Sequence, residues 1–386
     1  MHDVDALRGF ALIGIFVVNI TFMASGYPGN LVADPAFSST ADDVVRTLSS
    51  VLVDMKFYLL FSFLFGYSFM LQADAARRAG AAFAPRMLRR IAGLFVLGAL
   101  HFVFLSAGDI LATYAVVCLV LFWMRGIRDR TALRVAAAVY GVVLLSALVG
   151  SLFLDSSAFL PSGSEALASA ERTTGDLLGG WSSVIAAHLR GLPLLLIQSA
   201  SLQGPTALAM FLLGVVASRR RLFSRITGDD PVLRKTQLIG FPIGLAGGVL
   251  YALGGGNGNT LAVTASVATA PLLTAAYVAT LLRVLHNPRT AGVRAALAPA
   301  GRMALTNYLA QSLFGILVFT GIGLGAAGSL SPLALAGLAV LFFVFQMAAS
   351  ALWLRVFQYG PAEWVLRWIT NARRPAWRSA GNRGVP

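Results

Sequence analysis

The sequence is poor in charged residues and has a single cysteine. Only 12% of its 386 residues are charged, whereas 57% are hydrophobic, and the mean hydropathy is +0.76. A water-soluble protein carries about a quarter of its residues as charged side chains. The shortage therefore excludes a soluble enzyme and a disordered chain. The lone thiol, Cys118, excludes an intramolecular disulfide framework.

Several catalytic and metal-binding motifs are also missing. The sequence contains no Gly-Lys-Ser/Thr phosphate-binding loop and no Gly-x-Ser-x-Gly nucleophile elbow. Its four histidines are scattered and form no Cys/His constellation: His2, His101, His188 and His286. We therefore expect no metal site.

Long apolar runs are what the sequence has instead. A helix needs about 20 apolar residues to cross the hydrocarbon core of a bilayer. Ten runs meet or approach that length: 9–26, 51–72, 88–106, 109–125, 131–154, 191–217, 237–254, 260–284, 302–326 and 332–358. They predict an all-α, polytopic membrane bundle of about ten transmembrane helices. We expect residues 1–370 to form a single transmembrane domain and 371–386 to be a basic, disordered tail.

The positions of arginine and lysine predict the orientation of the bundle. With a cytoplasmic N-terminus, all but four of the 30 basic residues fall on inner segments. Both termini are therefore predicted to be cytoplasmic. The net charge of +14 then indicates topology and contact with anionic membrane lipids, and no nucleic-acid partner is expected. After Pro361, the four-residue spacings of Glu363 with Arg367 and of Trp364 with Trp368 predict a short interfacial helix.

The strongest candidate site lies in the third span and the turn that follows it. Arg90 and His101 are eleven residues apart, which places them on one helix face with an axial offset of about 16 Å. Arg89 and Arg90 would lie at the cytoplasmic surface, and Asp109 would mark the outer turn. This arrangement suits a thin ligand with an anionic head on the arginines and a reactive end near His101. The alternative is a histidine that hydrogen-bonds between helices, with arginines that only follow topology.

The first span repeats this spacing. Arg8 and Asn19 are also eleven residues apart, so Asn19 lies deep in the outer half of the membrane. A helix–helix hydrogen bond and a ligand contact explain Asn19 about equally well. Tyr114 belongs to the His101 group as a candidate substrate contact. Helix packing and substrate contact are both open for a second set of polar residues: Gln198, Asn307 and Gln311. The polar stretch around Gln198 predicts a broken helix that lines a cavity.

Five sequence blocks, in order from residue 5 to about 370, resemble the YeiB-like family of bacterial membrane proteins. They are Asp5–Leu12 with Asn19, Leu60–Tyr67, His101 with Gly108–Tyr114, Met303–Ser312, and Gly360–Arg367. Single blocks are weak, but five in order are specific. The resemblance implies a multi-pass protein of a bacterial plasma membrane.

That family is similar to a wider group of transmembrane acyltransferases, which includes the heparan glucosaminide acetyltransferases. These carry an acyl group from cytoplasmic acyl-CoA to an acceptor across the membrane. Their first span also has an Arg-Gly start and an outer Asn, which match Arg8-Gly9 and Asn19. Their catalytic histidine follows that Asn closely, whereas residues 20–35 here contain none. His101 is then the candidate base.

The leading hypothesis is an integral-membrane acyltransferase that uses acyl-CoA (acetyl-CoA) and a small-molecule or glycan acceptor. Arg89 and Arg90, with Arg8, would bind the CoA phosphates. His101 would act as general base, oriented by Asp109, and Asn19 would donate to the oxyanion. The alternatives are a proton-coupled transporter or lipid flippase, although no internal repeat is visible, and a non-catalytic scaffold. A homodimer is left open.

Overall fold

The structure, a computed structural model, describes residues 2–80, 82–153 and 162–378, and its regular elements are helices. Eight segments are long and apolar enough to span a membrane. Six are single helices: α1 (His2–Ala24), α4 (Phe83–Phe104), α6 (Asp129–Phe153), α12 (Pro231–Leu253), α13 (Thr260–His286) and α16 (Pro332–Val356). The other two are compound. One joins α2 (Thr40–Leu52) to α3 (Lys56–Arg78). The other joins α8 (Trp181–Arg190), α9 (Leu192–Gln198), the π-helical turn η3 (Ser199–Gln203) and α10 (Gly204–Arg219).

Two further apolar helices are too short to span a bilayer alone. They are α5 (Leu111–Trp123), with 13 residues, and α15 (Ala304–Phe319), with 16. At 1.5 Å per residue they extend only about 20 and 24 Å. The ten predicted apolar runs thus each have a helical counterpart, which confirms a polytopic helical membrane bundle. The ninth run, 302–326, holds a shorter helix than expected because the chain breaks at Met303 and again after Phe319.

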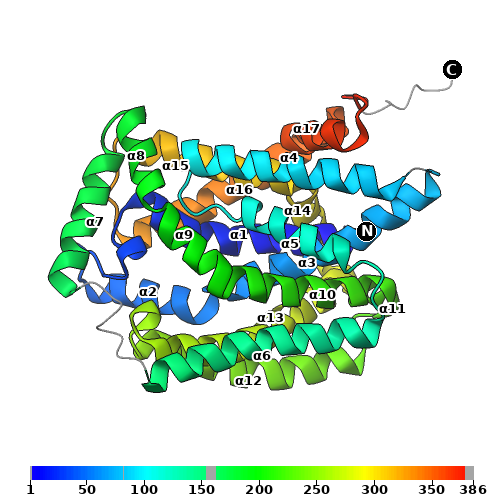
Figure 1. Cartoon of the computed structure of the whole chain (residues 1–386), viewed down its shortest axis with the longest axis horizontal. Helices are drawn as coiled ribbons and strands as arrows, with labels where there is room; N and C mark the ends of the chain where they lie inside the picture. The colour runs from blue at the N-terminus through cyan, green and yellow to red at the C-terminus, as the bar shows by residue number, and fades with distance from the viewer. Residues whose placement is uncertain (1, 81, 154–161, 379–386) are drawn as a thin grey trace.

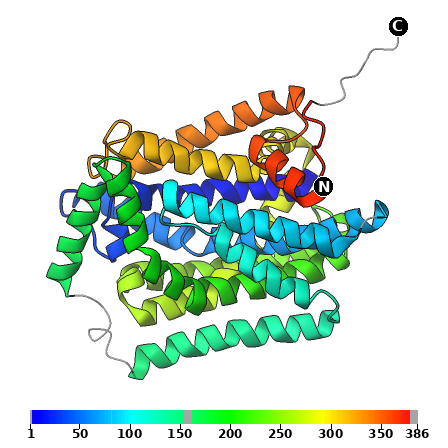
Figure 2. The same cartoon turned by 45° about the horizontal axis from the view of Figure 1, so that its top comes forward.

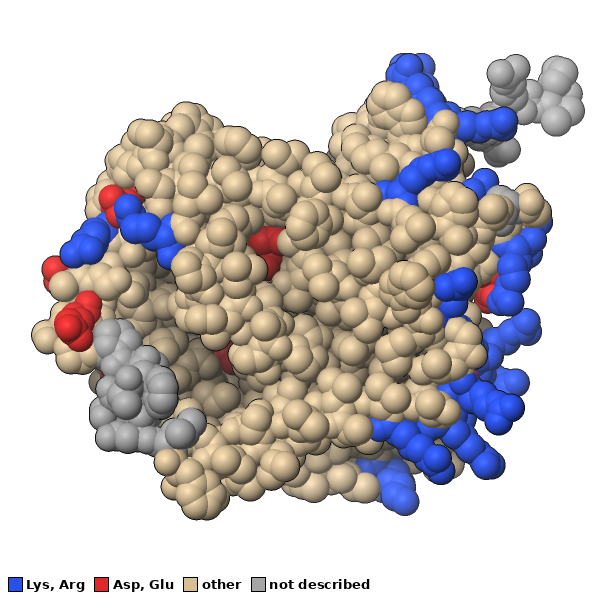
Figure 3. All heavy atoms as spheres, viewed as in Figure 1, with Lys and Arg blue, Asp and Glu red and all other residues tan. Residues whose placement is uncertain are grey.

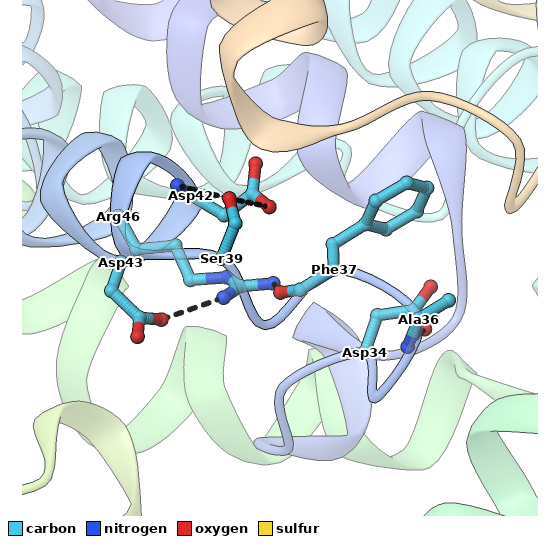
Figure 4. A network of polar contacts seen from close by, with 7 residues as sticks. All are labelled: Asp34, Ala36, Phe37, Ser39, Asp42, Asp43 and Arg46. Carbon is cyan, nitrogen blue, oxygen red and sulfur yellow. Dashed lines mark hydrogen bonds and ion pairs between the residues drawn. The ribbon is translucent and has the colours of Figure 1, made fainter.

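The smaller elements lie at the ends of the bundle. They are η1 (Pro28–Asn30), α7 (Gly163–Leu177), α11 (Leu222–Arg225), η4 (Gly256–Gly258), η5 (Pro288–Thr290), α14 (Ala291–Arg302) and α17 (Pro361–Asn371). At the outer end, Ser39 caps α2 by accepting a hydrogen bond from the Asp42 amide. Arg46 pairs with Asp43 at 3.0 Å and donates to the Phe37 carbonyl, so this turn is internally bonded (Figure 4).

The two ends of the bundle differ in charge, as the predicted topology requires. Both ends of the described chain lie at the same end of the bundle (Figures 1 and 2). Lysine and arginine crowd that end, whereas the acidic groups of the surface gather mainly at the opposite end (Figure 3). Under the positive-inside rule, the basic end is the cytoplasmic one. There Arg219 binds Asp129 at 3.2 Å and the carbonyls of Arg125 and Ile127, which ties α10 to the start of α6.

Small residues and aromatic rings hold the helices together. α3 and α10 cross where a Cβ on Gly66 would lie 2.2 Å from the Phe211 carbonyl oxygen, a contact that only glycine permits. Such small-residue crossings replace the hydrophobic effect as a means of helix association in lipid. Phe65 stacks on Phe211, and both rings pack edge-on against Tyr114. α1 runs through the middle of the bundle, and α6 lies at its edge (Figure 2).

The predicted interfacial helix is present as α17. It packs against α4 at the cytoplasmic end (Figure 1). Beyond it, Trp377 packs edge-on against Trp364 and Phe357, and the Trp364 indole donates to the Pro375 carbonyl at 3.0 Å. Residues 372–378 are therefore attached to the bundle. The rest of the predicted tail, 379–386, lies outside the described residues.

Candidate active site

The candidate site begins where α4 ends. The carbonyl of His101 accepts hydrogen bonds from the amides of Leu105 and Ser106, at 2.8 and 2.9 Å, and this closes the helix. The chain then turns back, so that Asp109 comes beside the histidine just before α5 begins. Gly98, one turn before His101, permits this approach. A Cβ there would lie 2.4 Å from the Ala112 nitrogen.

Asp109 orients the imidazole. Its Oδ1 accepts from Nδ1 of His101 at 2.9 Å, and its Oδ2 accepts from the Ala112 amide at 2.8 Å. Both side chains are only 1% exposed. Because an ionised carboxylate only accepts hydrogen bonds, this pairing assigns the histidine proton to Nδ1. Nε2 then keeps its lone pair as an acceptor.

Ser312 occupies the other side of the ring. Its Oγ lies 2.8 Å from Nε2 of His101, and the serine is completely buried in α15. One turn earlier, the Tyr308 ring lies 4.9 Å from the imidazole ring between centroids. Its hydroxyl points to the Gly108 carbonyl at 3.4 Å. The structure thus joins α4, the turn before α5, and α15 in one chain of hydrogen bonds from Asp109 through His101 to Ser312.

This chain has the connectivity of a Ser–His–Asp triad, in which an oriented imidazole accepts a proton from a hydroxyl. Sequence reasoning paired His101 with Asp109 but gave Ser312 no role. The sequence gives little reason to single out Ser312, because a serine in an apolar span usually serves helix packing. Only the fold brings residues 211 positions apart into contact.

The two predicted phosphate-binding arginines differ in their surroundings. Arg89 is exposed, whereas Arg90 is half-buried and lines a cavity of about 10 Å³ together with Gln72 and Cys118. A cavity of that size has room for about one water molecule. Arg8 is already bound, since its guanidinium pairs with Asp5 at 2.9 Å and donates to Ser68. Of Arg8, Arg89 and Arg90, only Arg90 is both partly buried and without an ion pair among the described residues.

Glu363 of α17 adds an acid to this cytoplasmic group. Its carboxylate accepts from the amides of Leu305 and Thr306, at 2.7 and 3.1 Å, and from the Thr306 hydroxyl at 2.5 Å. Glu363 thereby caps the N-terminus of α15, where the helix dipole is positive. Burial raises the pKa of the Glu363 carboxyl, and these hydrogen bonds offset part of that rise. Glu363 and Arg367 both lie close enough to Arg90 for their charges to act on it.

Two of the predicted substrate contacts serve helix packing. Asn307 donates to the Ala300 carbonyl and to Ser350, both at 3.0 Å. Gln311 donates to Gln346 of α16 at 2.9 Å, and its own Oε1 is buried without a hydrogen-bond partner among the described residues. Both residues contact α14 or α16, because they lie on a face of α15 about 100° around the helix from Tyr308 and Ser312.

The other predicted site residues, which the structure describes, form no hydrogen bond with the triad. The buried Tyr114 hydroxyl is 2.6 Å from Ser62 Oγ, inside the aromatic core. Gln198 is exposed on the side of α9. Asn19 is half-buried on α1, and its amide has no hydrogen-bond partner among the described residues. The predicted break in the sixth span is instead a π-helical turn, η3, through which the helix continues from α9 into α10, and Ser199 in this turn bonds to Thr113 of α5 at 3.0 Å. π turns are frequent at functional sites.

Within the described residues, no group of three or more His, Cys, Asp or Glu side chains is placed to hold a metal ion. The triad and the arginine group are the two polar clusters that contain the predicted base and the predicted phosphate-binding residues. They share α4, with Arg90 and His101 separated by an axial rise of about 16 Å.

Comparisons with known proteins identify relatives along nearly the whole length. Residues 217–373 match the family described as "Protein of unknown function (DUF418)". YxaH of Bacillus subtilis is 30% identical over 385 residues, which cover 95% of this chain and 93% of the relative. YeiB of Escherichia coli is 26% identical over 408 residues, covering 96% and 97%. A 39.9 kDa protein from the amylase 3' region of Bacillus acidopullulyticus is 28% identical and covers 96% and 93%. These relatives carry the description "uncharacterized". No solved structure matches the chain.

Proposed function

The chain belongs to the YeiB-like family that includes YxaH and YeiB, and on that premise we propose that it is an integral-membrane acyltransferase of a bacterial plasma membrane. It would transfer an acyl group, such as acetyl, from cytoplasmic acyl-CoA to an acceptor hydroxyl or amine at or across the membrane. The acceptor class is a small molecule or a glycan.

The observation that supports this function most is the buried Asp109–His101–Ser312 chain. An imidazole whose Nδ1 proton is held by a carboxylate can accept a proton at Nε2, and the carboxylate stabilises the imidazolium that forms. The proton then passes to the departing thiolate of CoA. A non-catalytic scaffold does not require a buried carboxylate, imidazole and hydroxyl in this order.

The arginine group supports the choice of donor. Acyl-CoA carries phosphates at one end and the reactive thioester at the other, so it needs cations remote from the base. Arg90 is the proposed phosphate-binding cation at the cytoplasmic side. Arg89 is its neighbour in the sequence, and Arg8 is close to it in space. Asn19, which makes no hydrogen bond among the described residues, is the proposed donor to the developing oxyanion. Loss of one such donor typically lowers the rate by about 10²–10³.

A transporter is the second candidate, and the short helices favour it. Many transporters build their substrate site from short or interrupted helices near the middle of the membrane. Here α5, α15 and the π turn η3 are of that kind. Proton-coupled uptake into vesicles that does not depend on acyl-CoA would favour transport over acyl transfer.

The test uses purified protein in nanodiscs with labelled acetyl-CoA and a panel of hydroxyl and amine acceptors. We expect transfer or slow hydrolysis in the wild type and none in His101→Ala. Asp109→Asn should lower kcat by about 10⁴, because the histidine loses its orienting carboxylate. His286→Ala, at the cytoplasmic end, is the matched control and should retain activity. Unchanged turnover in His101→Ala would remove the catalytic assignment.

A further inference from the structure

The hydroxyl of Ser312 hydrogen-bonds to an imidazole on another helix and not to the backbone of its own helix. In an apolar helix a serine or threonine usually satisfies its hydroxyl by donating to the carbonyl four residues earlier. Thr264, Thr269 and Thr280 all do so at 2.8 Å. Ser312 instead directs its hydroxyl to His101 on another helix. The side chain is thus held at the imidazole rather than at its own backbone.

We propose that Ser312 is a nucleophile that carries the acyl group as a covalent ester between donor and acceptor. The inference rests on the proposed function and names the group through which the acyl passes. Its basis is geometric. Ser312 Oγ lies 2.8 Å from Nε2 of a histidine whose Nδ1 is bonded to Asp109. This places an activated nucleophile, its base and an orienting acid in sequence.

The site also disfavours direct transfer to the acceptor. Only Nε2 of His101 can act as a base, because Nδ1 is bonded to Asp109. In this structure Nε2 is already hydrogen-bonded to Ser312 Oγ. An acceptor could reach that nitrogen only if the serine moved away. All three side chains are buried, which leaves little room at the imidazole for a donor and an acceptor together. An ester on Ser312 lets donor and acceptor use the confined site one after the other.

The two half-reactions balance without any added reagent. Ser312 Oγ bonds to the thioester carbonyl carbon while its proton moves to His101 Nε2. The carbon–sulfur bond breaks, and the imidazolium gives that proton to the CoA thiolate. In the second half, the acceptor hydroxyl or amine attacks the ester carbonyl and gives its proton to His101. The carbon–oxygen bond to Ser312 breaks, and the proton returns to the serine oxygen.

The experiment looks for the ester itself. Purified protein in nanodiscs is incubated with labelled acetyl-CoA without acceptor, denatured, and analysed by peptide mass spectrometry. We expect one acetyl group on Ser312, released by hydroxylamine, and isotope exchange between free CoA and acetyl-CoA. Ser312→Ala and His101→Ala should lose the label, and Ser312→Ala should lower kcat for transfer at least about 10³-fold. Ser266→Ala, a buried serine on α13 that donates to the Met55 sulfur, is the control and should retain the label.

The outcomes separate this inference from the function on which it rests. Transfer that persists in Ser312→Ala but is lost in His101→Ala would overturn the acyl-serine and leave the acyltransferase standing. Transfer by the wild type with no label on Ser312 would overturn it as well. If no variant and no wild-type preparation transfers acyl groups, the proposed function fails. Ser312→Cys guards against loss of folding in the alanine variant, because it keeps a nucleophile and should hold the label as a thioester.

Discussion

At the scale of single residues, the fold separates side chains that the sequence treats alike. Arg89 and Arg90 are neighbours in a basic cluster, and the positive-inside rule explains both. Successive residues of a helix point about 100° apart, so only one of them can face the bundle. Arg90 lines the cavity with Gln72, and Arg89 is exposed. The two arginines therefore form a natural matched pair.

Replacing Arg90 should weaken donor binding without slowing the chemistry. A hydrogen bond to a charged group contributes about 1.5–3 kcal/mol, so Arg90→Gln should raise KM for acyl-CoA roughly 10- to 100-fold. The value of kcat should change little, because Arg90 is about 16 Å from His101 along α4. Arg89→Gln should leave KM within about twofold, as expected for an exposed charge. Initial rates across acyl-CoA concentration give both constants. Equal effects of the two substitutions would contradict a specific role for Arg90.

At the scale of elements, the short helices create the site. α5 begins two residues after Asp109, and α15 carries Tyr308 and Ser312 on one face. Because both helices are too short to span, polar turns lie within the membrane body, where each polar group must find a partner. The partners of Asp109 are the imidazole and the Ala112 amide in the first turn of α5. The same contacts that satisfy the turn therefore hold the triad in place.

The close approach of α4 and α5 can be tested at Gly98. A Cβ there would lie 2.4 Å from the Ala112 nitrogen and 2.9 Å from Asp109 Oδ2, so Gly98→Ala must displace the turn. Overpacking of this kind costs about 1–3 kcal/mol. We expect lower thermal stability and a large fall in kcat, because Asp109 moves away from His101. Gly141→Ala on α6, where no atom lies within 4 Å, should instead stabilise the helix by about 0.5–1 kcal/mol. Equal melting temperatures for the two variants would refute the displacement.

At the scale of the whole molecule, one-dimensional patterns predict the body and leave the site incomplete. Hydropathy identifies the apolar helices and basic residues orient them, because each signal is local in the chain. The pairing of His101 with Asp109 could also be predicted from the sequence, since only a short turn separates the two residues. The contact of His101 with Ser312 was not, because it depends on how α4 and α15 pack. The same packing turns Asn307 and Gln311 toward α16, which no spacing rule could decide.

The orientation of the body leads to a prediction about accessibility from the two sides of the membrane. Ser164 is exposed on α7 at the outer end, and Ser224 is exposed on α11, between the cytoplasmic Arg221 and Arg225. Single cysteines at these positions, in a Cys118→Ala background, report the side directly. A membrane-impermeant maleimide should label Ser164→Cys in intact bacterial cells and Ser224→Cys only after permeabilisation. The wild-type thiol, Cys118, is buried and should not react in either case. Labelling of Ser224→Cys in intact cells would show that the bundle has the opposite orientation. Arg90 would then face away from cytoplasmic acyl-CoA.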